Sequence, residues 1–199
     1  MAQTVIGRGM AISRTVKGAL LAMAVLAVVS LLALTWYSRT VSFEEEFQLS
    51  DGRKILVRRS EHLKKACEGL ACDWSLDRTT IRLPEGPPWE FANLMPLLLD
   101  LDADGHPVIV ASPMTCGDYV RMNRPVPPYL QFELDSTNTW KRVEPARQFH
   151  GREANFLIAP DWRRGESAVV PLSEKQKRNS SPGLIPMSKR INLDLTGLC

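Results

Sequence analysis

The sequence predicts one membrane-spanning helix followed by a mainly β domain, an antiparallel sandwich or open barrel with some α-helix. Residues 18–37 are apolar and carry no charge. The chain after them contains about eight short runs of strand-forming residues, separated by turn residues at close intervals. The pattern does not alternate strands with helices, as a doubly wound fold would. We therefore expect a basic segment over 1–17, a transmembrane helix over 18–37 and a β-rich domain over 39–199.

The apolar run is long enough to cross a bilayer, because about 20 helical residues span its ~30 Å hydrocarbon core. Three basic residues and no acidic residue precede the run, which predicts a cytoplasmic N-terminus and an extracytoplasmic domain. Trp36 and Tyr37 suit the far membrane interface. The alternative is a cleaved signal peptide, but its apolar part is usually shorter, and no clean A-x-A site follows here. In either case the domain faces the periplasm or the extracellular space, at the inner (plasma) membrane.

The charge balance of the predicted domain excludes one class of partner. All 22 acidic residues and all but three of the 25 basic residues follow the apolar run, so the domain is formally neutral. It therefore lacks the general basic surface that nucleic-acid binding requires. The expected partners are the lipid bilayer and another envelope component, either a protein or a glycan.

Four cysteines follow the apolar run, and an even count in an oxidising compartment predicts two disulfides. Cys67 and Cys72 are the favoured pair, because Gly69 allows the short loop between them to close. Cys116 and Cys199 would then form the second bond, although the sequence alone leaves three pairings open. A zinc site needs two short cysteine spacings, and the chain has only one, a C-x4-C.

Alternation of apolar and polar residues predicts the strands of the domain. Turns at Ser50-Asp51-Gly52 and Ala103-Asp104-Gly105 predict two hairpins, since an Asp-Gly pair between apolar runs is a strong hairpin signal. The clearest half-buried strand is 130–135, where Leu130, Phe132 and Leu134 alternate with polar residues. The predicted strands, in order, are 43–49, 54–59, 79–83, 97–102, 107–112, 130–135, 139–144, 155–159 and 167–172.

Helix is expected in only two places of the domain. Ser60 can cap a short helix over 61–68 that ends at Gly69. One helical turn is expected over 173–178. Prolines and a glycine interrupt 113–128, which predicts a long irregular loop.

The most specific chemical pattern is the acidic run Asp100, Asp102 and Asp104 followed by Gly105. Three carboxylates at alternate positions can converge on one hard cation, and the pattern matches the opening of a calcium loop. Ala111 stands where an EF-hand needs a bidentate Glu, so an EF-hand is excluded. The run resembles the hairpin loops of integrin-type FG-GAP propeller repeats, but it occurs once, whereas a propeller needs several blades. The alternative is a tight hairpin turn with Asp100 and Asp102 together on its polar side.

No motif points to a particular enzyme. The nucleophile-elbow, phosphate-loop, dinucleotide-binding and zinc-protease patterns are absent from the sequence. The acidic side chains of Glu85, Glu90 and Asp118 would suit a hydrolase only if the fold brought two of them together. The three histidines are scattered and expected at the surface: His62, His106 and His150.

These observations favour a non-enzymatic envelope protein, anchored once in the membrane, whose outward domain binds or scaffolds another envelope component. A membrane-tethered hydrolase acting on cell-wall or glycan substrates is the first alternative. A calcium-dependent binding module that uses Asp100, Asp102 and Asp104 is the second. The identity of the ligand or partner is open.

Overall fold

The chain forms two units, Met1–Ser38 and Arg39–Cys199. The computed structural model describes residues 23–26, 37–68, 71–162, 165–166 and 168–199. In the first unit, residues 23–26 are helical and Tyr37 is exposed. The rest of the predicted transmembrane segment 18–37, including Trp36, lies outside the described residues, as does the predicted segment 1–17. Among the residues that are described, no helix combines the length and the apolar character of a membrane span.

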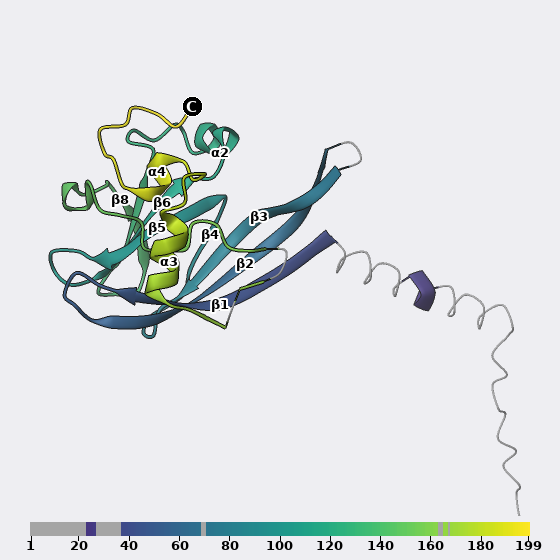
Figure 1. The fold of residues 1–199 in the computed structure, drawn as a ribbon, viewed down its shortest axis with the longest axis horizontal. Coiled ribbons are helices and arrows are strands. Elements are labelled where there is room, and N and C mark those ends of the chain that lie inside the picture. The colour runs from purple at the N-terminus through teal and green to yellow at the C-terminus, as the bar shows by residue number, and fades with distance from the viewer. Residues whose placement is uncertain (1–22, 27–36, 69–70, 163–164, 167) are drawn as a thin grey trace, which may run out of the picture. The chain divides into compact units, whose positions relative to one another are not determined.

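The second unit is mainly β and contains two separate sheets (Figure 1). Sheet A has the order β4-β3-β2-β1-β9 and sheet B the order β5-β6-β7-β8. The strands of sheet A are β1 (Ser38–Gln48), β2 (Lys54–Glu68), β3 (Ala71–Arg82), β4 (Trp89–Ala92) and β9 (Val169–Val170). The strands of sheet B are β5 (Leu94–Leu101), β6 (Pro107–Pro113), β7 (Leu130–Leu134) and β8 (Trp140–Val143). Neighbouring strands of sheet B are antiparallel, whereas β9 pairs with β1 in parallel.

An apolar core contains buried residues of both sheets. Sheet A contributes Phe47 and Val57, and sheet B contributes Ile109 and Phe132, all almost fully buried. In β1 and β2 buried residues alternate with exposed or half-exposed ones, so sheet A keeps one wet face. The alternation therefore predicted correctly which residues of β1 face the core.

In sheet B, β5, β6 and β7 are buried on both faces. The chain after β8 covers its outer face, where sheet residues such as Val108 and Tyr129 pack against Phe149, Ile158 and Ile191. Short helices lie along this covering segment and in the loop between β6 and β7. They are α2 (Cys116–Arg121), a 3-10 turn (Arg147–Phe149), α3 (Leu172–Asn179) and α4 (Pro186–Lys189).

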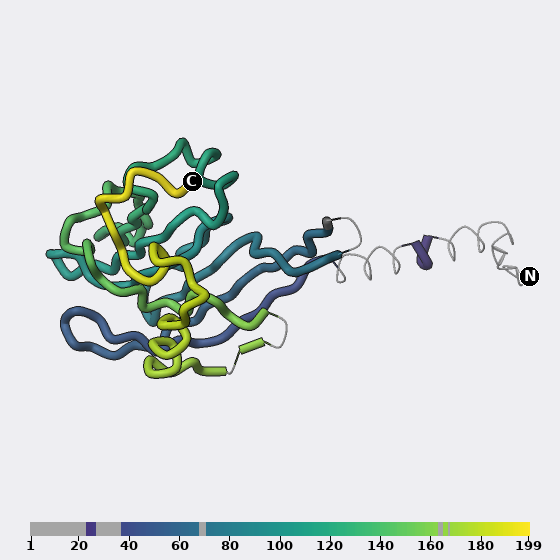
Figure 2. Tube along the Cα trace, turned by 45° about the horizontal axis from the view of Figure 1, so that its top comes forward, coloured from purple at the N-terminus to yellow at the C-terminus, as the bar shows by residue number. Residues whose placement is uncertain are grey.

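Two disulfides close the domain, with the favoured pairing. Cys67–Cys72 joins facing residues of β2 and β3 near the end of their hairpin. Cys116–Cys199 joins residues 83 positions apart and fastens the last residue of the chain to α2. Figure 2 shows the C-terminus beside the teal segment that contains α2. No cysteine is free.

Several predicted elements are wrong. Residues 61–68 do not form a helix; they continue β2, because each of them pairs with a residue of β3. Consequently β3 begins at Ala71 rather than at 79. The predicted strand over 155–159 is an irregular segment, and the predicted loop over 113–128 contains α2. The helical turn expected over 173–178 is confirmed as α3.

Candidate functional site

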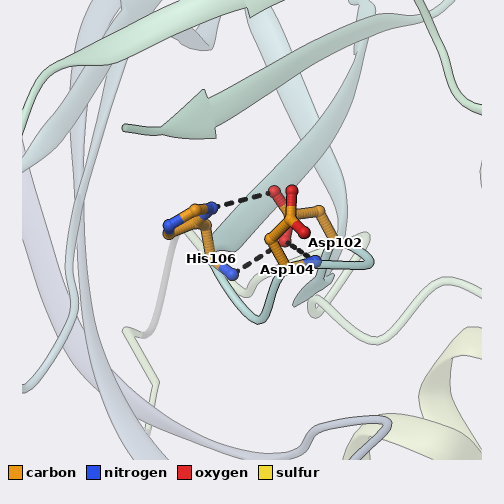
Figure 3. A group of neighbouring side chains, drawn as sticks. All are labelled: Asp102, Asp104 and His106. Atoms are coloured by element: carbon orange, nitrogen blue, oxygen red, sulfur yellow. Dashed lines mark hydrogen bonds and ion pairs between the residues drawn. The ribbon is translucent and has the colours of Figure 1, made fainter. Parts of the chain in front are cut away.

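The acidic run forms the turn of the β5–β6 hairpin, and Asp102, Asp104 and His106 gather there (Figure 3). One ligand atom from each of the three lies within 4.8 Å of the others. Asp102 Oδ1 accepts hydrogen bonds from the backbone N–H groups of Asp104 and His106, both at 2.8 Å. Asp102 Oδ2 lies 3.2 Å from His106 Nδ1. Both oxygens of Asp102 therefore already serve the turn itself.

The pKa of Asp102 is lowered below its ordinary value. Burial of the carboxyl group acts to raise this pKa, but the hydrogen bonds from the two backbone N–H groups and the imidazole of His106 outweigh it. Asp102 is thus a carboxylate at neutral pH. Gly105 has φ +85°, a conformation that glycine adopts without strain. The polar groups of this turn already hydrogen-bond to one another, so a cation would have to compete with backbone N–H donors for the carboxylate of Asp102.

Asp100 lies apart from this group, and the prediction that it shares the polar side of the hairpin with Asp102 is wrong. Only 1% of Asp100 is exposed. Its Oδ2 lies 2.5 Å from Arg152 Nη2, and its Oδ1 accepts a hydrogen bond from Ser50 N at 2.7 Å. Both faces of β5 are covered, so alternation could not tell a wet position from a buried one. Asp100 instead ties the β1–β2 turn to the segment after β8.

The three carboxylates considered for a hydrolase lie on three different elements. Glu90 on β4 forms an exposed ion pair with Arg78, with Oε1 and Nη1 2.7 Å apart. Asp118 is buried in α2, where it accepts hydrogen bonds from Thr115 Oγ1 and Arg121. Glu85 is exposed on the loop between β3 and β4. Two of these groups are therefore already engaged by neighbours in sequence or in the sheet.

Four buried charged residues form a network that the sequence analysis missed: Glu45, Arg59, Glu61 and Lys175. Glu45 Oε1 lies 3.2 Å from Arg59 Nη1, and Glu45 Oε2 lies 3.3 Å from Lys175 Nζ. Arg59 also pairs with Glu61 and donates to Leu157 O at 2.8 Å. Two positive and two negative charges thus balance in the interior. The network fastens α3 and the irregular segment around Leu157 to sheet A.

Burial and charge pairing shift the pKa values of both cations of this network. Burial lowers the pKa of Lys175 to about 8, although Glu45 acts in the opposite direction. Burial also opposes the charge of Arg59, but the carboxylates of Glu61 and Glu45 outweigh it and raise its pKa. A sequence signal existed: in β1 the alternation places Glu45 on the same face as Phe43 and Phe47. An acidic residue between two core positions indicates a buried ion pair.

A cavity of about 670 Å³ lies at the C-terminal segment. Its lining includes the apolar side chains of Ile185 and Met187 and the polar side chains of His150 and Arg190. Its size falls within the range of small-molecule sites. His150 is partly committed, because its Nδ1 accepts a hydrogen bond from Leu193 N at 3.2 Å.

The end of the β2–β3 hairpin is an exposed part of the described domain. Both strands are long, with 15 residues in β2 and 12 in β3. Figure 1 shows them extending, with β1 beside β2, away from the helices and from sheet B. From Lys64 to Cys67 and from Ala71 to Ser75 every described side chain is exposed or half-exposed. We call these two stretches the ribbon end.

Trp74 is the largest side chain of the ribbon end. It is half-exposed, and Lys65 Nζ lies 5.8 Å from the centre of its ring. An amphipathic aromatic beside a lysine is a common component of contact surfaces. The sequence contained this tryptophan but did not show its position, because residues 61–68 were expected to be helical. The chain matches none of the family models, curated protein sequences or solved structures to which it was compared.

Proposed function

We propose that this chain is an envelope protein, anchored by residues 18–37, whose β domain binds another envelope component outside the cytoplasm. The uncharged apolar run and the basic residues before it support the anchor and its orientation. The two disulfides support an oxidising compartment for the domain, since structural disulfides form and persist there.

The ribbon end carries the proposal of a binding role. It contributes no buried described residue, yet it holds a regular strand pair up to the Cys67–Cys72 disulfide. An isolated two-stranded hairpin is marginally stable in water, and this one is supported by its disulfide and by the packing of Trp74 against the buried cluster that contains Leu63 and Leu76. A rigid, exposed ribbon loses little conformational freedom on binding, which favours association.

The hydrolase and calcium-binding alternatives have less support. A hydrolase would need two carboxyl groups about 5–10 Å apart, and Glu90 and Asp118 are engaged by partners on different elements. A calcium module would need carboxylate oxygens that are available to the ion. Asp102 uses both of its oxygens within the turn, and Asp100 is paired with Arg152.

The compartment is tested by a reporter fused after Cys199 in intact cells. We expect alkaline phosphatase, which needs an oxidising compartment, to be active there, and a fluorescent protein that matures only in the cytosol to be dark. The opposite pattern would contradict the anchor orientation and the function together.

Binding is tested by cross-linking in intact cells, comparing the full chain with a variant whose ribbon is shortened. Replacing residues 65–74 by Asn-Gly would join the facing residues Lys64 and Ser75 through a two-residue turn. We expect a cross-linked partner with the full chain and at least a tenfold lower yield with the shortened variant. Equal yields from the two proteins, or no adduct from either, would contradict the binding role of the ribbon end.

A further inference from the structure

Two side-chain pairs show how β2 runs relative to β1, its neighbour in sheet A. Thr40 Oγ1 lies 3.0 Å from His62 Nδ1. Two residues further along β1, Ser42 Oγ lies 2.8 Å from Ser60 Oγ. The residue number in β2 falls as the number in β1 rises, so the two strands are antiparallel. β2 therefore returns towards the residues with which the chain enters the domain.

The ribbon end extends beyond the start of β1. Ser38, the first residue of β1, precedes Thr40 by two positions, so the same register places it opposite Lys64. Cys67 lies three positions beyond Lys64. At the rise of a strand, the ribbon end thus reaches about 10 Å past the first residue of β1.

No spacer separates the proposed anchor from this strand. Tyr37 is the last residue of the apolar run, and β1 begins at Ser38. A chain that leaves the bilayer at Tyr37 therefore enters sheet A at once, and β2 brings the ribbon end back to the same level. The headgroup layer is about 5–7 Å thick on each side of the hydrocarbon core. An extension of about 10 Å past the start of β1 is sufficient to reach that layer.

The side chains of the ribbon end suit a headgroup layer. Trp74 packs in part against the cluster that contains Leu63 and Leu76, and it remains half-exposed. Lys65 Nζ lies 5.8 Å from the centre of its ring, so an aromatic ring and an ammonium group share one surface. Amphipathic aromatics and lysines with apolar stems are the side chains that occupy membrane interfaces.

From this geometry, and resting on the proposed anchor, we infer that the ribbon end lies in the headgroup layer of the membrane, held there by Trp74 and Lys65. The covalent connection selects the lipid surface, because a contact within reach of a short tether is effectively intramolecular. Charge is not needed for the selection, and Lys64 is already paired with Asp77 at 2.6 Å. Ser75 follows Trp74 and points to the opposite face of the ribbon, which stays available to the envelope partner.

Paramagnetic relaxation of backbone amides tests this placement. The full chain is incorporated into phosphatidylcholine nanodiscs that contain a lipid with a gadolinium chelate on its headgroup, and discs with the diamagnetic lutetium chelate serve as the reference. We expect at least fivefold more relaxation enhancement at Lys65 and Trp74 than at Asp51 and Gly52. These two residues lie in the turn at the opposite ends of β1 and β2, roughly 35 Å from Lys65 along β2. Equal enhancement at the two ends would overturn the inference.

Two variants of Trp74 test whether its ring holds the ribbon end. Trp74→Gln removes the aromatic ring and should lower the relaxation enhancement at Lys65 at least threefold. Trp74→Tyr keeps an amphipathic ring and should retain the enhancement within about twofold. Unchanged chemical shifts of the Asp51 and Gly52 amides show that each variant is folded. An enhancement that Trp74→Gln leaves unchanged, or that a folded Trp74→Tyr chain loses, would overturn the inference.

The placement and the proposed function fail separately. A chain that stays in the nanodiscs without excess relaxation at Lys65 and Trp74 would refute headgroup contact and leave the anchor and the envelope partner in place. A chain that does not incorporate into nanodiscs would refute the anchor, and with it both the proposed function and this inference.

Discussion

The edge strand β5 and the part of β3 that extends beyond β4 face the same physical problem and meet it differently. An edge strand presents unpaired backbone groups that invite pairing with other chains. On β5, the side chain of Asn155 takes the place of a neighbouring strand: its Oδ1 accepts Leu99 N at 2.8 Å, and its Nδ2 donates to Leu99 O at 2.7 Å. On β3 beyond β4, the side chain of the neighbouring residue Asp73 accepts the Trp74 N–H through its Oδ1 at 2.8 Å.

Because the two edges are covered differently, we expect mutations at β5 to affect the stability of the domain and mutations at β3 to affect binding. The Asn155 bonds are sheltered, and the chain around them also covers the outer face of sheet B. The Asp73 bond is exposed to water, which can replace it. We therefore expect changes near β5 to unfold the domain, and changes along the ribbon end to alter binding while the domain stays folded.

The largest expected effect comes from the disulfide that holds the covering segment. Replacing Cys116 and Cys199 by serine opens a loop of 83 residues, which costs about 4.5 kcal/mol in the chain-entropy model. Replacing Cys67 and Cys72 by serine opens a loop of 5 residues, which costs about 2 kcal/mol on the same basis. Chemical denaturation of the two double variants measures both. Equal losses of unfolding free energy in the two double variants would contradict a larger contribution of Cys116–Cys199 than of Cys67–Cys72.

A pH-dependent change in stability of similar size is expected in the buried charge network, at Lys175 on α3. Lys175 has a pKa of about 8 in the folded chain and 10.5 as its ordinary value. Between these pH values the unfolded chain binds more protons, so this residue makes stability rise with pH, by up to about 1.4 kcal/mol per pH unit. The difference in unfolding free energy between wild type and Lys175→Met should therefore shift in favour of wild type from pH 8 to 10.5. A difference that is constant with pH would contradict a depressed pKa.

A smaller effect is expected from uncovering the edge of β5. Asn155→Ala removes two hydrogen bonds and leaves buried backbone groups of Leu99 unpaired, which costs about 2 kcal/mol. The matched change on the open edge, Asp73→Ala, should cost less than about 0.5 kcal/mol, because water can bond to the exposed Trp74 N–H. Thermal unfolding of both variants gives the comparison directly. A larger loss for Asp73→Ala would reverse our assignment of the two edges.

No effect is expected from calcium. The carboxylate of Asp102 serves the N–H groups of its own turn, so the β5–β6 hairpin needs no ion to be stable. The melting temperature of the full chain should be the same in millimolar calcium and in chelator. A rise with calcium that Asp104→Asn abolishes would restore the calcium-binding alternative.

The sequence predicted the β class and the Cys67–Cys72 bond because both depend on local pattern, and Cys116–Cys199 is the pair that then remains. Alternation in β1 and the continuous apolar runs of β5 and β6 follow from one wet face in sheet A and two covered faces in sheet B. Residues 61–68 were predicted as a helix because Ser60 can cap a helix at its start and Gly69 can end it. These residues form a strand instead, because each of them pairs with a residue of β3, and the sequence of 61–68 alone does not show that pairing.

The candidate site was less predictable, since its parts converge from distant positions. Asp100 was expected in solvent, and its partner Arg152 lies 52 positions further along the chain. His106 joins Asp102 and Asp104 only when the hairpin closes. The open edge of β3 depends on where β4 stops, and the turn at Asn93 sets that point.

Photo-cross-linking from single positions in living cells tests the central claim most directly. A benzophenone amino acid at Ser75, in the ribbon end, is compared with one at Thr137, an exposed residue of the β7–β8 turn. The account predicts a protein adduct from Ser75 on ultraviolet irradiation and none from Thr137. No adduct from Ser75, or the same adduct from both positions, would contradict partner binding at the ribbon end.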